Sequence, residues 1–442
     1  MRKTTTTLIT LAAAAVATAA AGGVGALSLA GSSSTLAPSS AMADTPGSGQ
    51  SVIDWNRELI SILGTPGAQP ATVHPTRSLA MLQAAEHDAV VSITHGAPPY
   101  RFSTTAARDA RPDAAADQAA HDVLLALYPS MRSALDTRLT EELAGIPDGQ
   151  AEDDGVAVGA SVARRLVAAR DSDGSSAAAT PFVPGTRAGD YRPTPPKFAD
   201  PVYTGWGSVT PFVLDSPQQV RPAPPPSVHS AEYAAALQEV ADLGRDSSTT
   251  RTADQTVAGR FWSSAPVWNT WNEVTQQLLT DRHASLAQAT RVFSALDLAL
   301  ADTTIAMYDA KYDEAVWRPV TAIQLGDTTG SPGSTGDPTW NPLTPTAADP
   351  SYPGAHSAIS EAAATVLISF YGPDQQVTVT SAADPGVTRT FGSLSDAADE
   401  AGLSRIWSGQ HTRLDHDAGQ QLGGTVADRV LDALSVRGDG TH

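Results

Sequence analysis

Residues 285–317, SLAQATRVFSALDLALADTTIAMYDAKYDEAVW, form the longest stretch of the sequence with a helical pattern of apolar residues. Spacings of three and four residues are typical of a helix that buries one face, so we predict a long helix here. Shorter helical stretches lie at 77–93, 115–146 and 155–172. Alternating strand patterns are scarce, and two short ones within 376–393 predict a minor hairpin. The sequence therefore predicts an all-α, helical-bundle fold.

Changes in composition divide the chain into segments. Residues 173–230 are rich in Gly, Ser, Thr and Pro, and Pro removes backbone hydrogen-bond donors, so this segment is predicted to be a long irregular connector. It separates an N-terminal helical half, 44–172, from a C-terminal helical half, 231–436. We expect these halves to pack together as two helical bundles.

The N-terminus resembles a secretory signal peptide. Arg2 and Lys3 precede a long Ala-rich apolar run, and Ala41-Met42-Ala43 matches a small-x-small cleavage pattern. We therefore predict that residues 1–43 are removed and that the protein is secreted. An uncleaved membrane anchor is the alternative, which the weak apolarity of Ala and Gly disfavours.

Composition also restricts the chemistry. The chain of 442 residues has 28 basic and 47 acidic side chains, a net charge of −19, so it lacks the excess of positive charge that nucleic-acid binding requires. It contains no cysteine, which excludes disulfides, thiolate catalysis and zinc–cysteine sites. An anion site in such a chain has to gather its own positive charge.

The first candidate motif contains Lys311 and Arg318. These residues are seven apart, or two helical turns, so we expect them on one face of the long helix, which Pro319 ends or bends. The second motif is YPGAH, 352–356, in front of an Ala-rich helical stretch. The first backbone N–H groups of a helix have no internal partner, so His356 lies where an anion can bind.

The third candidate motif surrounds His411. Ser408 is a candidate cap for the helix that follows, which would place His411 in its first turn. Asp415, four residues on, lies on the same face and can hold one imidazole nitrogen. Arg405 precedes the cap and can fold over the helix start. His416 points about 100° away from Asp415 and is predicted to be exposed.

These cations and histidines together favour an oxyanion site over two alternatives. A zinc site at His411, Asp415 and His416 lacks an H-E-x-x-H pair, and the neighbouring cations would oppose a metal cation. A serine hydrolase site lacks a G-x-S-x-G turn. Each motif by itself could also be a solvated polar helix face.

The three motifs, in this order, resemble those of the vanadium-dependent haloperoxidase and phosphatidic acid phosphatase type 2 superfamily. The matching residues are Lys311, six residues, Arg318-Pro319; YPGAH in place of Pro-Ser-Gly-His; and Ser404-Arg405, five residues, His411, three residues, Asp415. The helical run before Lys311 and the segment WRPVTAI resemble the secreted bacterial haloperoxidase-like branch.

This resemblance implies roles for individual residues. Vanadate or phosphate would be bound by the side chains of Lys311, Arg318 and Arg405 and near the backbone of Gly354 and Ala355. His411 would be the vanadium ligand, Asp415 would orient it, and His356 would be the acid–base catalyst. The implied activity is peroxide-dependent oxidation of halide, bromide rather than chloride, with vanadate as cofactor and an organic acceptor.

Two alternatives stay open at this point. One is a secreted acid phosphatase that hydrolyses a phosphomonoester or lipid phosphate, with His411 as nucleophile and no cofactor. The other is a non-catalytic anion-binding relative. All three imply small-molecule ligands (peroxide, halide and organic acceptor, or a phosphate ester). None implies nucleic acid or a membrane span after signal cleavage, and the oligomeric state is left open.

The sequence departs from the family pattern at two places. Gly354 stands where the motif has serine, so one hydroxyl hydrogen bond to the anion, worth about 1.5–3 kcal/mol, is lost unless Ser351 or Ser357 replaces it. Asp349, five positions earlier, stands where fungal chloroperoxidases have an aromatic residue. A carboxylate that faces the pocket would repel halide.

Overall fold

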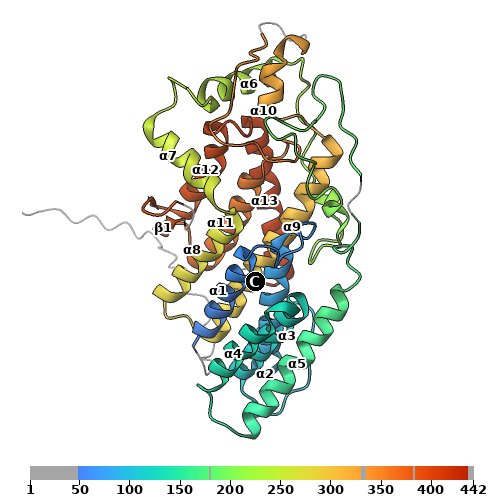
Figure 1. Ribbon diagram of the computed structural model, residues 1–442. Coiled ribbons are helices and arrows are strands. Elements are labelled where there is room, and N and C mark those ends of the chain that lie inside the picture. The colour runs from blue at the N-terminus through green and yellow to red at the C-terminus, as the bar shows by residue number, and fades with distance from the viewer. Residues whose placement is uncertain (1–47, 179–180, 330–334, 382–383, 437–442) are drawn as a thin grey trace, which may run out of the picture. The chain divides into compact units, whose positions relative to one another are not determined.

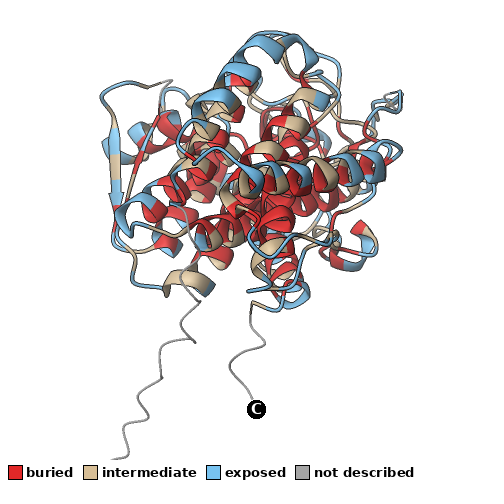
Figure 2. Cartoon of the chain, turned by 90° about the horizontal axis from the view of Figure 1, so that it is seen from below, coloured by how far each residue is buried: buried red, intermediate tan, exposed pale blue. Residues whose placement is uncertain are grey.

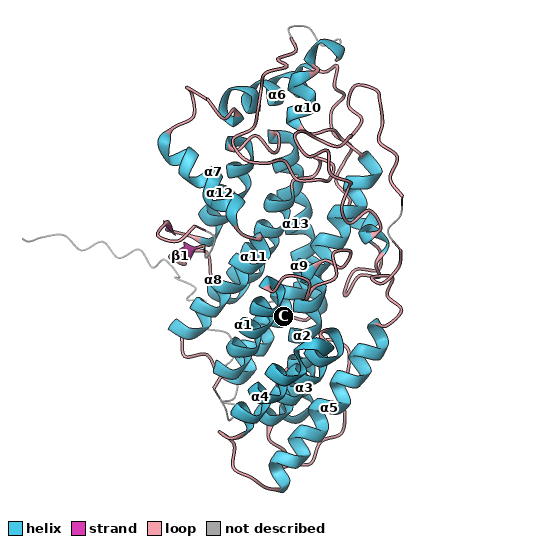
Figure 3. Ribbon diagram, viewed as in Figure 1, coloured by secondary structure: helices cyan, strands magenta, loops and turns pink. Residues whose placement is uncertain are grey.

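The computed structural model describes residues 48–178, 181–329, 335–381 and 384–436 (Figure 1). In these residues helices predominate, and the only paired strands form one hairpin (Figure 3). The predicted all-α fold with a minor hairpin is therefore confirmed. The predicted signal peptide and its cleavage position lie outside the described residues. Among the described helices, none combines the length and apolarity needed to cross a membrane.

The bounds of the helices and strands are α1 Gln50–Gly64, α2 Pro75–Thr94, α3 Pro112–Leu127, α4 Arg132–Leu143, α5 Gln150–Arg170, α6 Ala231–Gly244, α7 Ala253–Ser264, α8 Val267–Asp281, α9 Leu286–Glu314, α10 Pro319–Gln324, α11 Ala355–Tyr371, β1 Val377–Thr380, β2 Thr388–Phe391, α12 Leu394–Trp407 and α13 Arg413–Ala433. Besides the connector, two long segments without α-helix or strand separate these elements, between α2 and α3 and between α10 and α11.

The long helix α9 is the centre of the packing. A capping box between Ser285 and Gln288 satisfies the backbone at its start. Every residue from 292 to 308 is buried, because α2, α11 and α13 all pack against it. Figure 2 shows the buried residues of the chain, in red, gathered in the interior. Helix α9 thus contacts helices from both predicted halves of the chain.

The predicted helical stretch 115–146 is divided into two helices. Helix α3 ends at Leu127, a short 3-10 turn spans Pro129–Met131, and α4 then begins at Arg132. Pro129 lacks an N–H donor and disfavours the helical conformation of the residue before it, so a single continuous helix is excluded.

The Pro/Gly-rich connector packs against α9. Asp302, buried on α9, accepts hydrogen bonds from the backbone N–H groups of Phe212, Val213 and Leu214, at 2.6, 2.8 and 2.8 Å from its carboxylate oxygens. A buried carboxylate requires such donors. The irregular backbone is therefore fixed to the central helix at this point.

Glycines allow α11 and α13 to approach closely. A Cβ atom on Gly423 would lie 2.0 Å from the carbonyl oxygen of Ala358, whereas one on Gly424 would lie no closer than 3.7 Å to any neighbour. Only the first of the two adjacent glycines is therefore required by the packing.

This difference generates a stability prediction. Gly423→Ala should lower the free energy of unfolding by about 1–3 kcal/mol, because the added methyl group forces the two helices apart. Gly424→Ala should raise it by about 0.5–1 kcal/mol, because alanine favours the helix without a clash. Urea denaturation of both variants measures the effects, and destabilisation of equal size at both positions would contradict this packing.

Candidate active site

The three sequence motifs meet where several helices begin or end. Lys311 lies in the last turn of α9, and Arg318 is the residue that caps α10. His356 is in the first turn of α11 and Arg405 in the last turn of α12. His411 lies between α12 and α13, two residues before α13 begins. The fold therefore brings these five predicted side chains to helix ends.

Lys311 and Arg318 are not on one helix, so that prediction is wrong. Helix α9 ends at Glu314 because Ala315 adopts a left-handed conformation, with φ 44° and ψ 46°. The two cations nevertheless come together, since both contact the carboxylate of Asp349.

The cap of α13 also differs from the prediction. Ser408 ends α12, and Thr412 caps α13 through a capping box with Asp415. His411 therefore lies just outside the helix rather than in its first turn. The expected pairing with Asp415 is present, with 3.4 Å between His411 Nδ1 and Asp415 Oδ2.

Asp415 connects the start of α13 to the loop in front of α11. Its carboxylate accepts hydrogen bonds from Ser351 Oγ at 2.8 Å and from the backbone N–H of Thr412 at 2.7 Å. Its carbonyl oxygen accepts from the N–H of Gly354 at 2.8 Å. Burial acts to raise the pKa of Asp415, but His411 and the hydrogen bonds from Thr412 and Ser351 outweigh it and lower the pKa.

His411 is neutral and presents one basic nitrogen to the cations. Burial lowers the pKa of His411 to about 3, and the charge of Arg318 acts in the same direction. Arg318 Nη1 lies 3.1 Å from His411 Nε2 and can only donate. The hydrogen-bond network therefore assigns the proton to Nδ1, beside Asp415, and the lone pair to Nε2.

Asp349 contacts both Lys311 and Arg318, which its position in the sequence did not reveal. Arg318 Nη2 donates to its Oδ1, and Lys311 Nζ lies 3.4 Å from its Oδ2. Burial acts to raise the pKa of Asp349, but the charges of Lys311 and Arg318 lower it to about 2. Burial lowers the pKa of Lys311 to about 8 although Asp349 opposes this shift, so the pair is ionised at neutral pH.

The other donors of these two cations bind backbone oxygens. Lys311 Nζ donates to the carbonyls of Pro350 and Ser351, while Arg318 donates to those of Asp349 and Gln410. Protein groups thus satisfy both side chains.

Arg405 is different, because one of its donors has no acceptor. Its Nη1 donates to Ser263 Oγ, but its buried Nε has no hydrogen-bond partner among the described residues. Burial lowers the pKa of Arg405 to about 9, and Arg318 acts in the same direction, so the guanidinium stays charged at neutral pH. A buried donor without a partner costs about 1–3 kcal/mol, and an oxyanion oxygen would satisfy it.

His356 is also neutral. Its Nε2 lies 2.9 Å from the carbonyl oxygen of Trp262, which can only accept, so Nε2 carries the proton. The side chain keeps some solvent contact, yet burial lowers its pKa well below the usual value, with Arg405 and His411 acting in the same direction. Nδ1 is then the nitrogen that can accept a proton.

No replacement for the missing motif serine is in place within the described ranges. The hydroxyl of Ser351 donates to Asp415, and that of Ser357 lies 2.9 Å from His416 Nδ1. The N–H of Gly354 is taken up by the Asp415 carbonyl, which leaves the N–H of Ala355 at the helix start. His416 is buried, so its predicted exposure is wrong.

Aromatic side chains near Asp349 were not predicted as part of the site. His74 caps α2, and its ring centre lies 5.0 Å from that of Tyr203 and 4.6 Å from that of Trp268. Tyr308 is 5.8 Å from His74, and its pKa is raised by burial and then by the charge of Asp349. These aromatic residues are scattered singly along the sequence, so no sequence pattern would have identified them as neighbours of Asp349.

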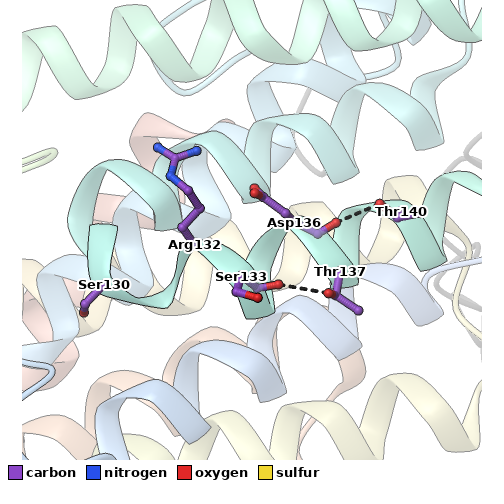
Figure 4. Close-up of a pocket in the computed structure, with 6 residues that line it drawn as sticks. All are labelled: Ser130, Arg132, Ser133, Asp136, Thr137 and Thr140. Carbon is purple, nitrogen blue, oxygen red and sulfur yellow. Dashed lines mark hydrogen bonds between the residues drawn. The ribbon is translucent and has the colours of Figure 1, made fainter.

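A cavity of about 480 Å³ lies between the connector and the loop that leads to Asp349. Its lining is Thr194, Pro195, Pro196, Lys197, Ala199, Val320, Asn341, Pro342, Leu343, Thr344, Pro345, Thr346 and Ala348. A second depression lies on α4 (Figure 4), where Thr137 and Thr140 bond to the carbonyls of their own helix. Neither lining includes Lys311, Arg318 or Asp349, although the first contains Ala348, the residue before Asp349.

Comparisons with known proteins show what the sequence and the fold are similar to. Residues 291–438 match the family model for the VCPO second helical-bundle domain. The fold is similar to that of a bacterial vanadium-dependent iodoperoxidase, with a TM-score of 0.76 and 24% identity over 88% of this chain and 97% of that one. Among proteins of curated function, none matches the sequence significantly.

Two structures of bacterial vanadium-dependent chloroperoxidase are also similar. The holo form has a TM-score of 0.67 and 16% identity, over 85% of this chain and 95% of that one. The apo form has a TM-score of 0.63 and 14% identity, over 84% of this chain and 96% of that one.

The burial of His416 generates a prediction about stability. His416→Ala should lower the free energy of unfolding by about 2 kcal/mol, because it removes a buried hydrogen bond to Ser357 and leaves a void beside Gly402. His229→Ala, at an exposed position, should change it by less than about 0.5 kcal/mol. Thermal and denaturant unfolding measure both, and two equally small effects would contradict the packing of His416.

Proposed function

We infer that this chain, whose residues 291–438 match the family model for the VCPO second helical-bundle domain, is a vanadium-dependent haloperoxidase that oxidises halide with peroxide. The observation that carries this proposal is the partnerless Nε of Arg405, buried within electrostatic reach of Arg318 and Asp349. We further propose that the protein is secreted and cleaved after Ala43.

Four side chains are suited to hold vanadate. Lys311, Arg318 and Arg405 would bind its oxygens, and the N–H of Ala355 at the helix start would add a donor. His411 would bind the vanadium through Nε2, the nitrogen whose lone pair faces Arg318. When bound, vanadate activates peroxide as an electrophile without changing its own oxidation state.

The residues around His411 prepare it for this role. Asp415 holds the proton on Nδ1, which keeps Nε2 free to act as a ligand. Arg318 would exchange its bond to His411 Nε2 for a bond to the anion. Arg318 would thus have an acceptor for this donor both with and without the bound anion.

His356 is placed for proton transfer. Its Nε2 proton is held by the carbonyl of Trp262, so Nδ1 would accept the proton that peroxide loses on binding. A neutral imidazole with a lowered pKa takes that proton only transiently, which suits a group that must return it.

Asp349 favours bromide over chloride as the substrate. Its negative charge offsets part of the positive charge that would polarise peroxide, and chloride is the harder of the two halides to oxidise. The same carboxylate would repel a halide held close to Lys311.

The activity test compares two reactions of the same protein. The apo-protein is incubated with orthovanadate, peroxide, bromide and a chromogenic acceptor, and separately with an aryl phosphate without vanadate. We expect halogenation without phosphatase turnover. Phosphatase turnover without halogenation would support the acid phosphatase instead, and inactivity in both reactions would contradict either enzyme.

A matched pair of variants tests the role of His411. His411→Ala should lower halogenation by at least about 100-fold, because it removes the proposed vanadium ligand. His229→Ala should leave the rate unchanged, because that residue is exposed and outside the site. Full activity of His411→Ala would contradict the proposed ligand.

A further inference from the structure

Asp349 lies where an oxyanion would otherwise meet the two cations. One carboxylate oxygen accepts from Arg318 and the other lies 3.4 Å from Lys311 Nζ. The side chain is 5% exposed, so water screens these contacts little. Its charge also acts on Arg405, which places it within reach of all three cations.

The charges of the site can be counted from these contacts. Lys311 and Arg318 are cations paired with the carboxylate of Asp349, and Arg405 is a third cation. Asp415 is the second carboxylate, and His411 is neutral because its Nε2 faces a donor of Arg318. One net positive charge remains. Without Asp349 the same site would carry two, since Asp415 is committed to His411 and Thr412.

We propose that Asp349 determines which oxyanions the site accepts, by making it bind tetrahedral monoanions in preference to dianions. The proposal rests on the oxyanion site of the proposed function and adds its charge specificity. A monoanion balances the remaining charge, whereas a dianion leaves an uncompensated negative charge in a buried site beside a fixed carboxylate. The ligand class is thus the singly charged form of vanadate, phosphate or a similar ion.

The test uses two tetrahedral anions of similar size and fixed charge at neutral pH. Perrhenate is a monoanion and molybdate is a dianion of the same tetrahedral shape. The ratio of their affinities for the full chain therefore reports the effect of ligand charge. Isothermal titration calorimetry should show that the natural protein binds perrhenate more tightly than molybdate. In Asp349→Asn the ratio of affinities should shift toward molybdate by about tenfold or more.

Two further variants serve as controls. Asp313→Asn removes the same charge from a half-exposed side chain of α9 and should leave the ratio unchanged. Asp349→Glu keeps the charge and should retain the preference for perrhenate. If Asp349→Asn does not fold, as its unfolding curve would reveal, the preference of the natural protein and of Asp349→Glu decides the question.

Failure of this inference is distinguishable from failure of the proposed function. Tighter binding of molybdate than of perrhenate by the natural protein would overturn the charge specificity alone. So would an Asp349→Asn protein that binds both anions with the original ratio, because a purely structural carboxylate would not select by charge. Binding of neither anion by the natural protein or by Asp349→Asn would overturn the oxyanion site itself.

Discussion

The ion cluster of Asp349 with Lys311 and Arg318 is the constraint on which the site is built. Two buried cations destabilise a fold unless a counter-charge and hydrogen-bond acceptors surround them. Asp349 provides the charge, and the backbone carbonyls of its own loop and of the segment before α13 provide the acceptors. The contacts that satisfy Lys311 and Arg318 therefore also fix the loop between α10 and α11 against the end of α9 and the start of α10. Arg318 also bonds to the carbonyl of Gln410, which ties this region to the segment after α12.

The sequence predicted which residues gather but not how each one reaches the site. The resemblance of the three motifs to a known family was sufficient to predict that Lys311, Arg318, His411 and Asp415 form one cluster. The left-handed cap that separates the first two lies at Ala315, and alanine carries no local signal for that conformation. The position of His416 on its own helix likewise predicted that it is exposed. That prediction failed because the partners that bury His416 come from α11 and α12, which are remote in sequence.

The environment of Asp349 could not be predicted for a related reason. Whether its carboxylate faces a pocket, solvent or a cation depends on how an irregular loop lies against α9, and no periodic pattern describes such a loop. The same holds for Asp302, whose three backbone donors come from a connector about 90 residues away in sequence. Buried carboxylates of this kind hold non-helical segments to the bundle, and their partners emerge only from the tertiary structure.

The two departures from the family pattern, at Gly354 and Asp349, both reduce the capacity of the site to stabilise negative charge. A Cβ atom on Gly354 would lie 3.0 Å from the carbonyl oxygen of Asp415, so the close approach of α11 and α13 leaves little room for a serine. Losing that hydroxyl removes a donor, and gaining Asp349 adds a negative charge among the cations. Ser351 and Ser357 do not replace the lost hydroxyl donor, because their own hydroxyls are engaged elsewhere. A site with fewer donors and less positive charge stabilises a singly charged anion more readily than a doubly charged one.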